Sequence, residues 1–455
     1  MRGAAVSAEG ALPPQAAGYP APVADRDQQV GPHLGPLTAG DPHVSIRTAV
    51  TSSRLAAQPL VGFLTLLMVG IIWLLLSVVF GVVQSLETIA ATSTFWLPVL
   101  LVVAAWWHGW PGSLTKSRPG AGIVNTVIFI VAALVLTGIA QVIVGKADFG
   151  AIFHAGGTFP TFPFLVPLAA TIFIAMLQLT FVCDRWPFER MKPIPAGLSA
   201  LVLCWAIGLL VYFTVINWNF LPAPARAAMG LRNPSGPVNA LDFIAWLVCL
   251  VPFQLIFFQL LSGWPFREFE NRVSRLVTSN VFVIGAGWLT YLFLANVLRW
   301  PGPTIIGAVG TVAVGVNFSS MAFEDYPFHH EKPSMARLGL VMNALGMAFL
   351  TYFVLRAIGN ALATWTNPPV ELFIGINSLN FIGAQVILVY AIWGRWPLPP
   401  PAPPTTDDAL VIDEIDQLTK AMSLGGSASI AGPATATDSS AAPASGNGTD
   451  HGGEA

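Results

Sequence analysis

The stretch FEDYPFHHEKP, residues 323–333, brings imidazole and carboxylate side chains together within a few positions. Imidazole nitrogens and carboxylate oxygens are ligands that divalent transition metals accept. A site built only from neighbours in the chain is rare, because a metal needs several ligands that converge from different directions. We therefore expect neither a metal nor any other cofactor. If a metal does bind, His329, His330 and Glu324 are the candidate ligands.

Other motifs of enzymes and nucleotide-binding proteins do not occur in the sequence. No glycine-rich stretch ends in Gly-Lys-Ser or Gly-Lys-Thr, and neither a Gly-x-Ser-x-Gly elbow nor a His-Glu-x-x-His pair is present. The basic residues form no patch of the kind that binds nucleic acid. This pattern favours a protein that is not an enzyme. The alternative is a membrane-embedded enzyme, or a redox or metal-binding subunit, that uses the cluster at 324–331.

Neutral amide and phenol side chains are scattered through the apolar parts of the chain. Such groups can hold two helices together, for about 0.6 to 2 kcal/mol each, or they can line a path for a neutral solute. The candidates for a path are Asn317, Asn280, Asn343, Gln178, Gln259, Tyr212, Tyr291 and Tyr352.

Asn317 is the first of these candidates because small residues surround it. Gly310 and Gly315 precede it, and two serines follow it. Small side chains let helices approach closely, or leave room for a solute. The helix with Asn280 and Tyr291 comes just before it in the chain, and we expect the two helices to pack against each other.

The elements that carry these residues are long apolar runs. Of the 455 residues, 54% are hydrophobic and only 10% are charged, whereas soluble proteins have about 25% charged residues. A helix that crosses a bilayer needs about 20 apolar residues. Such runs begin near residues 59, 92, 121, 161, 195, 238, 275, 303, 337 and 370. The sequence therefore predicts an all-α polytopic membrane protein with ten transmembrane helices.

Every second run ends in an aromatic residue followed by proline. A proline cannot continue a helix, and Trp and Tyr favour the headgroup level of a bilayer. The predicted interface anchors are Trp110, Trp186, Trp264, Tyr326 and Trp396. The recurrence predicts five tandem helical hairpins, at about 56–118, 119–193, 194–272, 273–333 and 334–398. A pair of inverted five-helix halves is the competing arrangement.

Lys and Arg gather on the side of the Trp–Pro endings, as at Arg185, Arg190 and Arg267. Because cytoplasmic loops are enriched in basic residues, we expect these endings and both termini in the cytoplasm. The excess of Arg over Lys and the many Ala, Gly and Pro residues suggest a bacterial protein, and hence the bacterial inner membrane.

Two polar segments flank the membrane domain at 56–398. Residues 1–55 and 399–455 are rich in Pro, Ala, Gly and Ser and are predicted to be cytoplasmic tails. Within the second tail, Val411, Ile415, Leu418 and Met422 have helical spacing, which predicts a short amphipathic helix at 407–424. That helix is either a docking site for a cytoplasmic protein or an idle solvated segment.

The function that these features favour is a permease or channel-like protein for a small neutral or weakly polar solute. Its partners are then the lipid bilayer, the solute and a possible cytoplasmic protein, and not nucleic acid. Besides the enzyme or metal-binding alternative, the remaining hypothesis is a scaffold or sensor that does not transport and acts through its tails.

Overall fold

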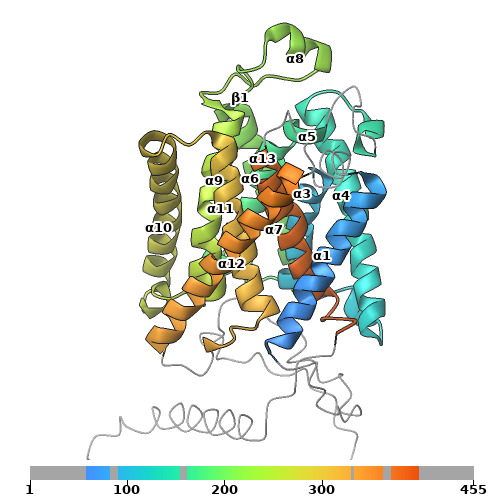
Figure 1. The fold of residues 1–455 in the computed structure, drawn as a ribbon. Coiled ribbons are helices and arrows are strands. Elements are labelled where there is room, and N and C mark those ends of the chain that lie inside the picture. The colour runs from blue at the N-terminus through green and yellow to red at the C-terminus, as the bar shows by residue number, and fades with distance from the viewer. Residues whose placement is uncertain (1–57, 82–90, 154–160, 329–332, 362–369, 399–455) are drawn as a thin grey trace, which may run out of the picture. The chain divides into compact units, whose positions relative to one another are not determined.

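A computed structural model of the chain describes residues 58–81, 91–153, 161–328, 333–361 and 370–398 (Figure 1). Nearly all regular structure in these ranges is helical. Seven helices are long and apolar enough to cross a membrane: Arg118–Val144, Pro193–Val215, Ala240–Leu260, Arg272–Val297, Gly302–Ala322, Ser334–Ala361 and Val370–Ile392. Three shorter apolar helices are Leu60–Leu76, Thr92–Trp106 and Val166–Val182. The protein is an all-α, multi-pass membrane protein.

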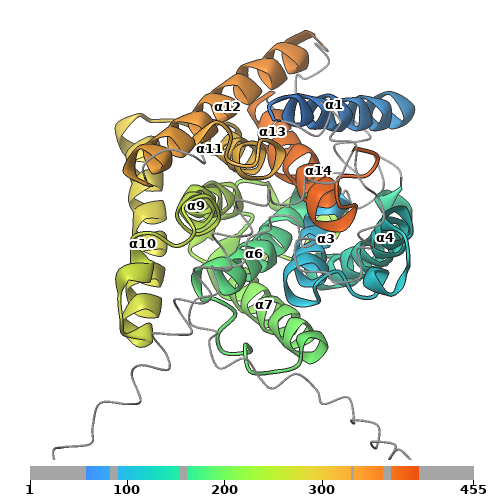
Figure 2. The same cartoon turned by 90° about the horizontal axis from the view of Figure 1, so that it is seen from below.

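Five helices form an inner ring, and each ends in a π-helical turn. The first three are α3 (Ala91–Leu101) with η4 (Val102–Trp106), α6 (Val166–Leu177) with η7 (Gln178–Val182), and α9 (Ala240–Gln254) with η8 (Leu255–Leu260). The others are α11 (Gly302–Asn317) with η11 (Phe318–Ala322), and α13 (Val370–Ile376) continued by η13 (Asn377–Gly383), α14 (Ala384–Ile387) and η14 (Leu388–Ile392). Each packs against the next, and η13 contacts α3, so the ring closes (Figure 2).

Five outer helices surround this ring: α1 (Leu60–Phe80), α4 (Arg118–Val144), α7 (Pro193–Val215), α10 (Arg272–Leu292) with η10 (Phe293–Val297), and α12 (Pro333–Ala361). They expose large apolar side chains such as Leu67, Val131, Val202, Val281 and Phe349, which are between 54% and 68% exposed. Among the described residues, no inner helix exposes a large hydrophobic side chain. The outer helices therefore supply the lipid-facing surface.

The remaining elements are short and lie in the connections: η5 (Gly112–Leu114), η6 (Phe149–Ile152), α5 (Thr161–Phe164), α8 (Ala223–Met229) and η9 (Phe266–Glu268). The strands β1 (Ile216–Asn217) and β2 (Val238–Asn239) pair in parallel. They close the segment that carries α8, so this connection, rich in Gly and Pro, is a folded cap. The sequence pattern does not predict this strand pair.

The five Trp–Pro or Tyr–Pro turns share one backbone hydrogen-bond pattern. In the first, Trp107 N donates to Val102 O, Gly109 N to Val103 O, and Trp110 N to Trp107 O. The same three bonds recur at the ends of η7, η8, η11 and η14. In every copy the two residues before the aromatic have positive φ, and the aromatic–proline peptide is cis. One local structure thus caps all five inner helices.

The sequence LRWP, residues 298–301, carries part of the same cap at the other end of the helices. After η10, Leu298 N donates to Phe293 O and Trp300 N donates to Leu294 O. Arg299 has positive φ, as the matching residues do in the five other turns. These bonds place Trp300 where Gly109 lies in the first turn, so the backbone pattern is shared but the Trp–Pro pair stands one position earlier than in the five other turns.

The helices that pack together differ from the expected hairpin partners. Outer helices α4, α7, α10 and α12 pack against the inner helices α3, α6, α9 and α11 that precede them in the chain. Each also touches the π-helical end of the inner helix one place earlier in the ring: α4 touches η14, α7 touches η4, α10 touches η7 and α12 touches η8. Helix α1 packs on α14, η13 and η11, which is the corresponding place beside the fifth inner helix.

The Asn280 helix, α10, is expected to pack against the Asn317 helix, α11, but α10 packs on α9, and its continuation η10 touches α11. On α10, Phe282 packs its ring against Phe253 of α9 and Phe257 of η8, with centroids 5.8 and 4.9 Å away. A side chain at Gly287 would lie 3.0 Å from Leu250 of α9. Succession in the sequence does not show which face of a helix is buried, and these aromatic and glycine contacts decide it.

Candidate functional site

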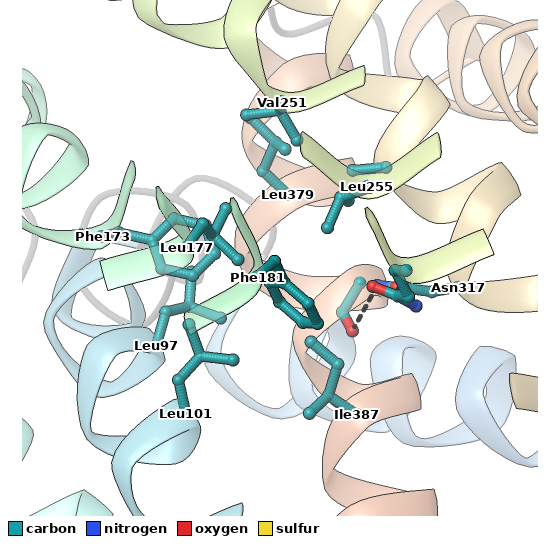
Figure 3. A pocket seen from close by; sticks show the side chains of 13 residues that line it. Leu97, Leu101, Phe173, Leu177, Phe181, Val251, Leu255, Asn317, Leu379 and Ile387 are labelled. Atoms are coloured by element: carbon teal, nitrogen blue, oxygen red, sulfur yellow. Dashed lines mark hydrogen bonds between the residues drawn. The ribbon is translucent and has the colours of Figure 1, made fainter. Parts of the chain in front are cut away.

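A small cavity lies on the axis of the inner ring, and its volume is about 20 Å³. Its lining is Leu97, Leu101, Phe173, Leu177, Phe181, Val251, Leu255, Gln259, Ala313, Asn317, Leu379, Gly383 and Ile387, with contributions from all five inner helices (Figure 3). A cavity of this size holds about one water molecule. The axis is therefore closed, chiefly by apolar side chains.

Two amides make the polar part of this lining. Gln259 Nε2 donates to Asn317 Oδ1 at 3.0 Å and to Ser320 Oγ at 2.9 Å. Asn317 Nδ2 donates to Gly383 O at 3.4 Å, across to the fifth inner helix. The Oε1 atom of Gln259 is buried without a hydrogen-bond partner among the described residues. The axis thus presents one unsatisfied acceptor to a water or to a donor group on a solute.

A second, wider cavity of about 610 Å³ opens at the Trp–Pro ends of the helices. It lies among the ends of η4, η7 and η8 and the beginnings of α7 and α10. Its volume is within the range of about 300 to 1,000 Å³ that is usual for small-molecule sites. Phe181 lines this cavity and the axial cavity alike, and its side chain is 3% exposed. Phe181 therefore lies between the two spaces, and Figure 3 shows it in the middle of the axial lining.

Basic side chains dominate the charge of the wide cavity. The charged and titratable residues in its lining are Arg185, Arg190, Arg267, Arg272, Arg275, His108, Asp184 and Glu189. Arg272 forms an ion pair with Glu189, which compensates one of the two carboxylates. The pKa of His108 is below its ordinary value, because the imidazole is partly buried and because Arg185 repels its protonated form. An excess of positive charge remains at the cavity.

Gln178 and Asn280, two further path candidates, lie in a network away from the axial lining. Gln178 Nε2 donates to Asn280 Oδ1 at 2.8 Å, and Gln254 Nε2 donates to Gln178 Oε1 at 2.7 Å. Asn280 Nδ2 also donates to Leu276 O. The network joins η7 and α9 of the inner ring to the outer helix α10, which is the arrangement of a packing contact.

The other four path candidates also lie outside the axial lining. Asn343 Nδ2 donates to Ser319 Oγ at 3.0 Å and joins α12 to η11. The hydroxyl of Tyr212 accepts from Trp218 Nε1 in the cap. Tyr291 packs beside Trp288, and the hydroxyl of Tyr352 accepts from Arg356. Of the eight candidates, only Gln259 and Asn317 line the axial cavity.

The five predicted anchors stand at matching places in the five turns. The ring nitrogen Nε1 of Trp264 donates to Glu268, and the guanidinium of Arg337 lies 4.6 Å from the Trp264 ring. Trp396 stacks on Trp393 and is 42% exposed, and Trp186 is 51% exposed. Among the described residues that line the wide cavity, none is one of the five anchors.

Glu324, proposed above as a metal ligand, forms an ion pair with Arg395, which is only 1% exposed. Gln58 Nε2 donates to the same carboxylate at 3.1 Å. His329 and His330 lie outside the described residues, as does the segment 407–424. Within the described part of the chain, no group of three His, Cys, Asp or Glu residues is placed to hold a metal.

The buried charges beside Glu324 are a feature that sequence reasoning missed. Arg395 lies 5.3 Å above the ring of Tyr390, and burial lowers its pKa to about 10. Burial also raises the pKa of Asp325 to about 6, and its Oδ1 atom has no hydrogen-bond partner among the described residues. In the sequence these charges look like ordinary interface residues, because nothing local shows that two turns far apart in the chain meet.

No known family, curated protein or solved structure matches this chain.

Proposed function

We propose that this protein is a permease of the bacterial inner membrane that moves a small, neutral or weakly polar solute through its inner ring. The proposal is supported by the ring of five inner helices, by the wide cavity at one end of it, and by the amide pair on its closed axis. A cavity open at one end and a sealed axis are what one state of an alternating-access cycle requires.

We propose ten spans, which include the three shorter apolar helices, and five repeats. The support for the repeats is the common cap of the five turns and the equivalent placement of all five outer helices. The repeating unit is then an inner helix with the outer helix that follows it, and α1 completes the unit of the fifth inner helix. Because α1 takes this place, each of the five inner helices has an outer helix in the same position beside it.

The observation that carries the proposal is the place of Phe181. It lines the wide cavity on one side and the axial cavity on the other. Movement of this one ring away from the axis would join the two spaces. The apolar lining and the unsatisfied Gln259 acceptor suit a solute with one or two donor groups and no net charge, since a charge in such surroundings is costly.

Uptake of small solutes by proteoliposomes tests this function. Purified protein would be given a panel of radiolabelled neutral solutes, such as polyols, amides and short alcohols, and compared with Asn317→Leu and Asn280→Leu. We expect uptake of at least one solute, strong impairment by Asn317→Leu, and uptake per folded molecule that is close to wild type in Asn280→Leu. Equal uptake by protein-free liposomes for every solute would favour a scaffold or sensor.

A further inference from the structure

The arginines of the wide cavity come from two separate parts of the chain and line one space. Arg185 and Arg190 belong to the segment between η7 and α7, and Arg267, Arg272 and Arg275 belong to η9 and the beginning of α10. Basic residues are common on cytoplasmic loops. That rule explains their side of the membrane, but it does not require five of them to line one cavity.

Three of these arginines have no ion-pair partner among the described residues: Arg190, Arg267 and Arg275. Two other arginines at the same ends of the helices are used for packing. Arg118 donates to Gly394 O, and Arg337 lies over the Trp264 ring. The cavity is therefore the place where guanidinium groups remain available to an anion.

Backbone dipoles add to this charge. The long helices α7 and α10 begin at the cavity, where Pro193 and Ala196 of α7 and Leu276 of α10 line it. The N-terminus of an α-helix carries about half a positive charge and favours anions. The cavity is thus electropositive from its side chains and from two helix ends.

The inner wall of the cavity is apolar and aromatic. Trp106, Phe181, Val182, Phe258 and Phe266 line it and are each no more than 7% exposed. A fully hydrated ion alone would leave this surface without a partner. A ligand with an anionic head at the arginines and an apolar body against the aromatic wall would satisfy both parts.

We infer that the wide cavity binds a phosphate group carried on an apolar body. A phosphate monoester has a charge of about −2 and three acceptor oxygens, which several guanidinium groups can bind in a bidentate manner. The phosphate belongs either to a soluble phosphate ester or to the headgroup of an anionic lipid. The inference does not depend on the proposed transport, because it concerns binding outside the Phe181 seal.

The test is a binding titration of the purified full-length protein in an uncharged detergent. The probes are phenyl phosphate, a short-chain phosphatidic acid and a short-chain phosphatidylcholine. We expect a phosphate monoester to bind, and Arg190→Gln/Arg275→Gln to weaken that binding by at least about tenfold, since hydrogen bonds to charged groups contribute most. Lys116→Gln/Lys192→Gln is the matched control: it changes the net charge equally, and neither lysine lines the cavity.

The two sources of the phosphate give different outcomes. Binding of both monoesters points to a soluble phosphate ester, and binding of phosphatidic acid alone points to a lipid headgroup. Arg190→Lys/Arg275→Lys keeps the charge but not the bidentate geometry and should restore part of the affinity, which separates loss of binding from loss of folding. Binding of neither monoester, equal binding of phosphatidylcholine, or equal loss in the lysine control would overturn the inference. A protein that binds phosphate but shows no uptake would contradict the proposed function alone.

Discussion

Gln259 and Asn317 meet on the axis of the inner ring, where Gln259 Nε2 donates to Asn317 Oδ1 at 3.0 Å. The two residues come from neighbouring inner helices, and both side chains are at least 95% buried. They are the polar side chains in a lining that is otherwise apolar or glycine. This pair therefore defines where a solute on the axis would find hydrogen bonds.

A double-mutant cycle should detect this pair. Asn317→Leu removes one acceptor of the Gln259 amide but leaves Ser320 Oγ, 2.9 Å away, so we expect the single variant to insert and fold. The coupling between Asn317→Leu and Gln259→Leu should be about 0.6 to 2 kcal/mol in the free energy of unfolding. Additive effects of the two substitutions would show that the pair does not form.

Gly122 tests the contact between outer and inner helices. A β-carbon there would lie 2.5 Å from the ring of Trp393, beside which Trp393 Nε1 donates to Thr126 Oγ1. Gly122→Ala should lower the free energy of unfolding by about 1 to 3 kcal/mol, because the ring must shift. A β-carbon added at Gly346 on α12 would have no atom within 4 Å, so this glycine is the control. Thermal unfolding should show little change for Gly346→Ala, and equal losses in both variants would contradict the packing.

Asp325 should make stability depend on pH. Burial raises the pKa of this carboxyl to about 6 from an ordinary value of 3.8, so the folded state binds the proton more tightly than the unfolded state does. The stability that the protonated Asp325 carboxyl contributes is fully present below about pH 4 and is lost as pH rises through about 6. Asp325→Asn should stabilise the protein at pH 7.5 by up to about 3 kcal/mol and have little effect at pH 4. The thermal midpoint at both pH values measures this difference, and an equal effect at both would be inconsistent with a buried carboxyl.

The orientation of the helices can be read from two exposed serines. Ser113 lies in η5 at a Trp–Pro end, and Ser235 lies in the connection between β1 and β2. In a variant without Cys183, Cys204 and Cys249, we expect Ser113→Cys to react only from the cytoplasmic side. Ser235→Cys should react from outside in intact cells. Reaction of both from one side would rule out the orientation.

The sequence predicts the helices well because their signals are local. Apolar runs and aromatic–proline endings lie within about 20 neighbouring residues, and the helices begin near the predicted positions. The pairing of helices depends on which faces are buried, as at Phe282, where the rings of Phe253 in α9 and Phe257 in η8 decide the contact. The sequence gives the order of the helices but not that choice.

Site prediction shows the same limit. Residue type and position single out the amides, and Asn317 and Gln259 do lie on the axis, whereas Gln178 and Asn280 join an outer helix to the ring. Phe181 could not be selected, because one phenylalanine among 29 becomes distinctive only when two cavities meet at it. The Arg395–Glu324 pair likewise requires that two distant turns come together.

The most direct test of the account is the reactivity of a cysteine on the axis. Ala313 lines the axial cavity and is 5% exposed. In the cysteine-free protein, Ala313→Cys should react slowly with 2-sulfonatoethyl methanethiosulfonate, which does not cross membranes. Adding Phe181→Ala should speed the reaction from the Trp–Pro side by at least about tenfold, because the seal is removed. Phe188→Ala, which alters the wide cavity alone, should not. Unchanged reactivity in Phe181→Ala, or equal acceleration in Phe188→Ala, would contradict a path closed at Phe181.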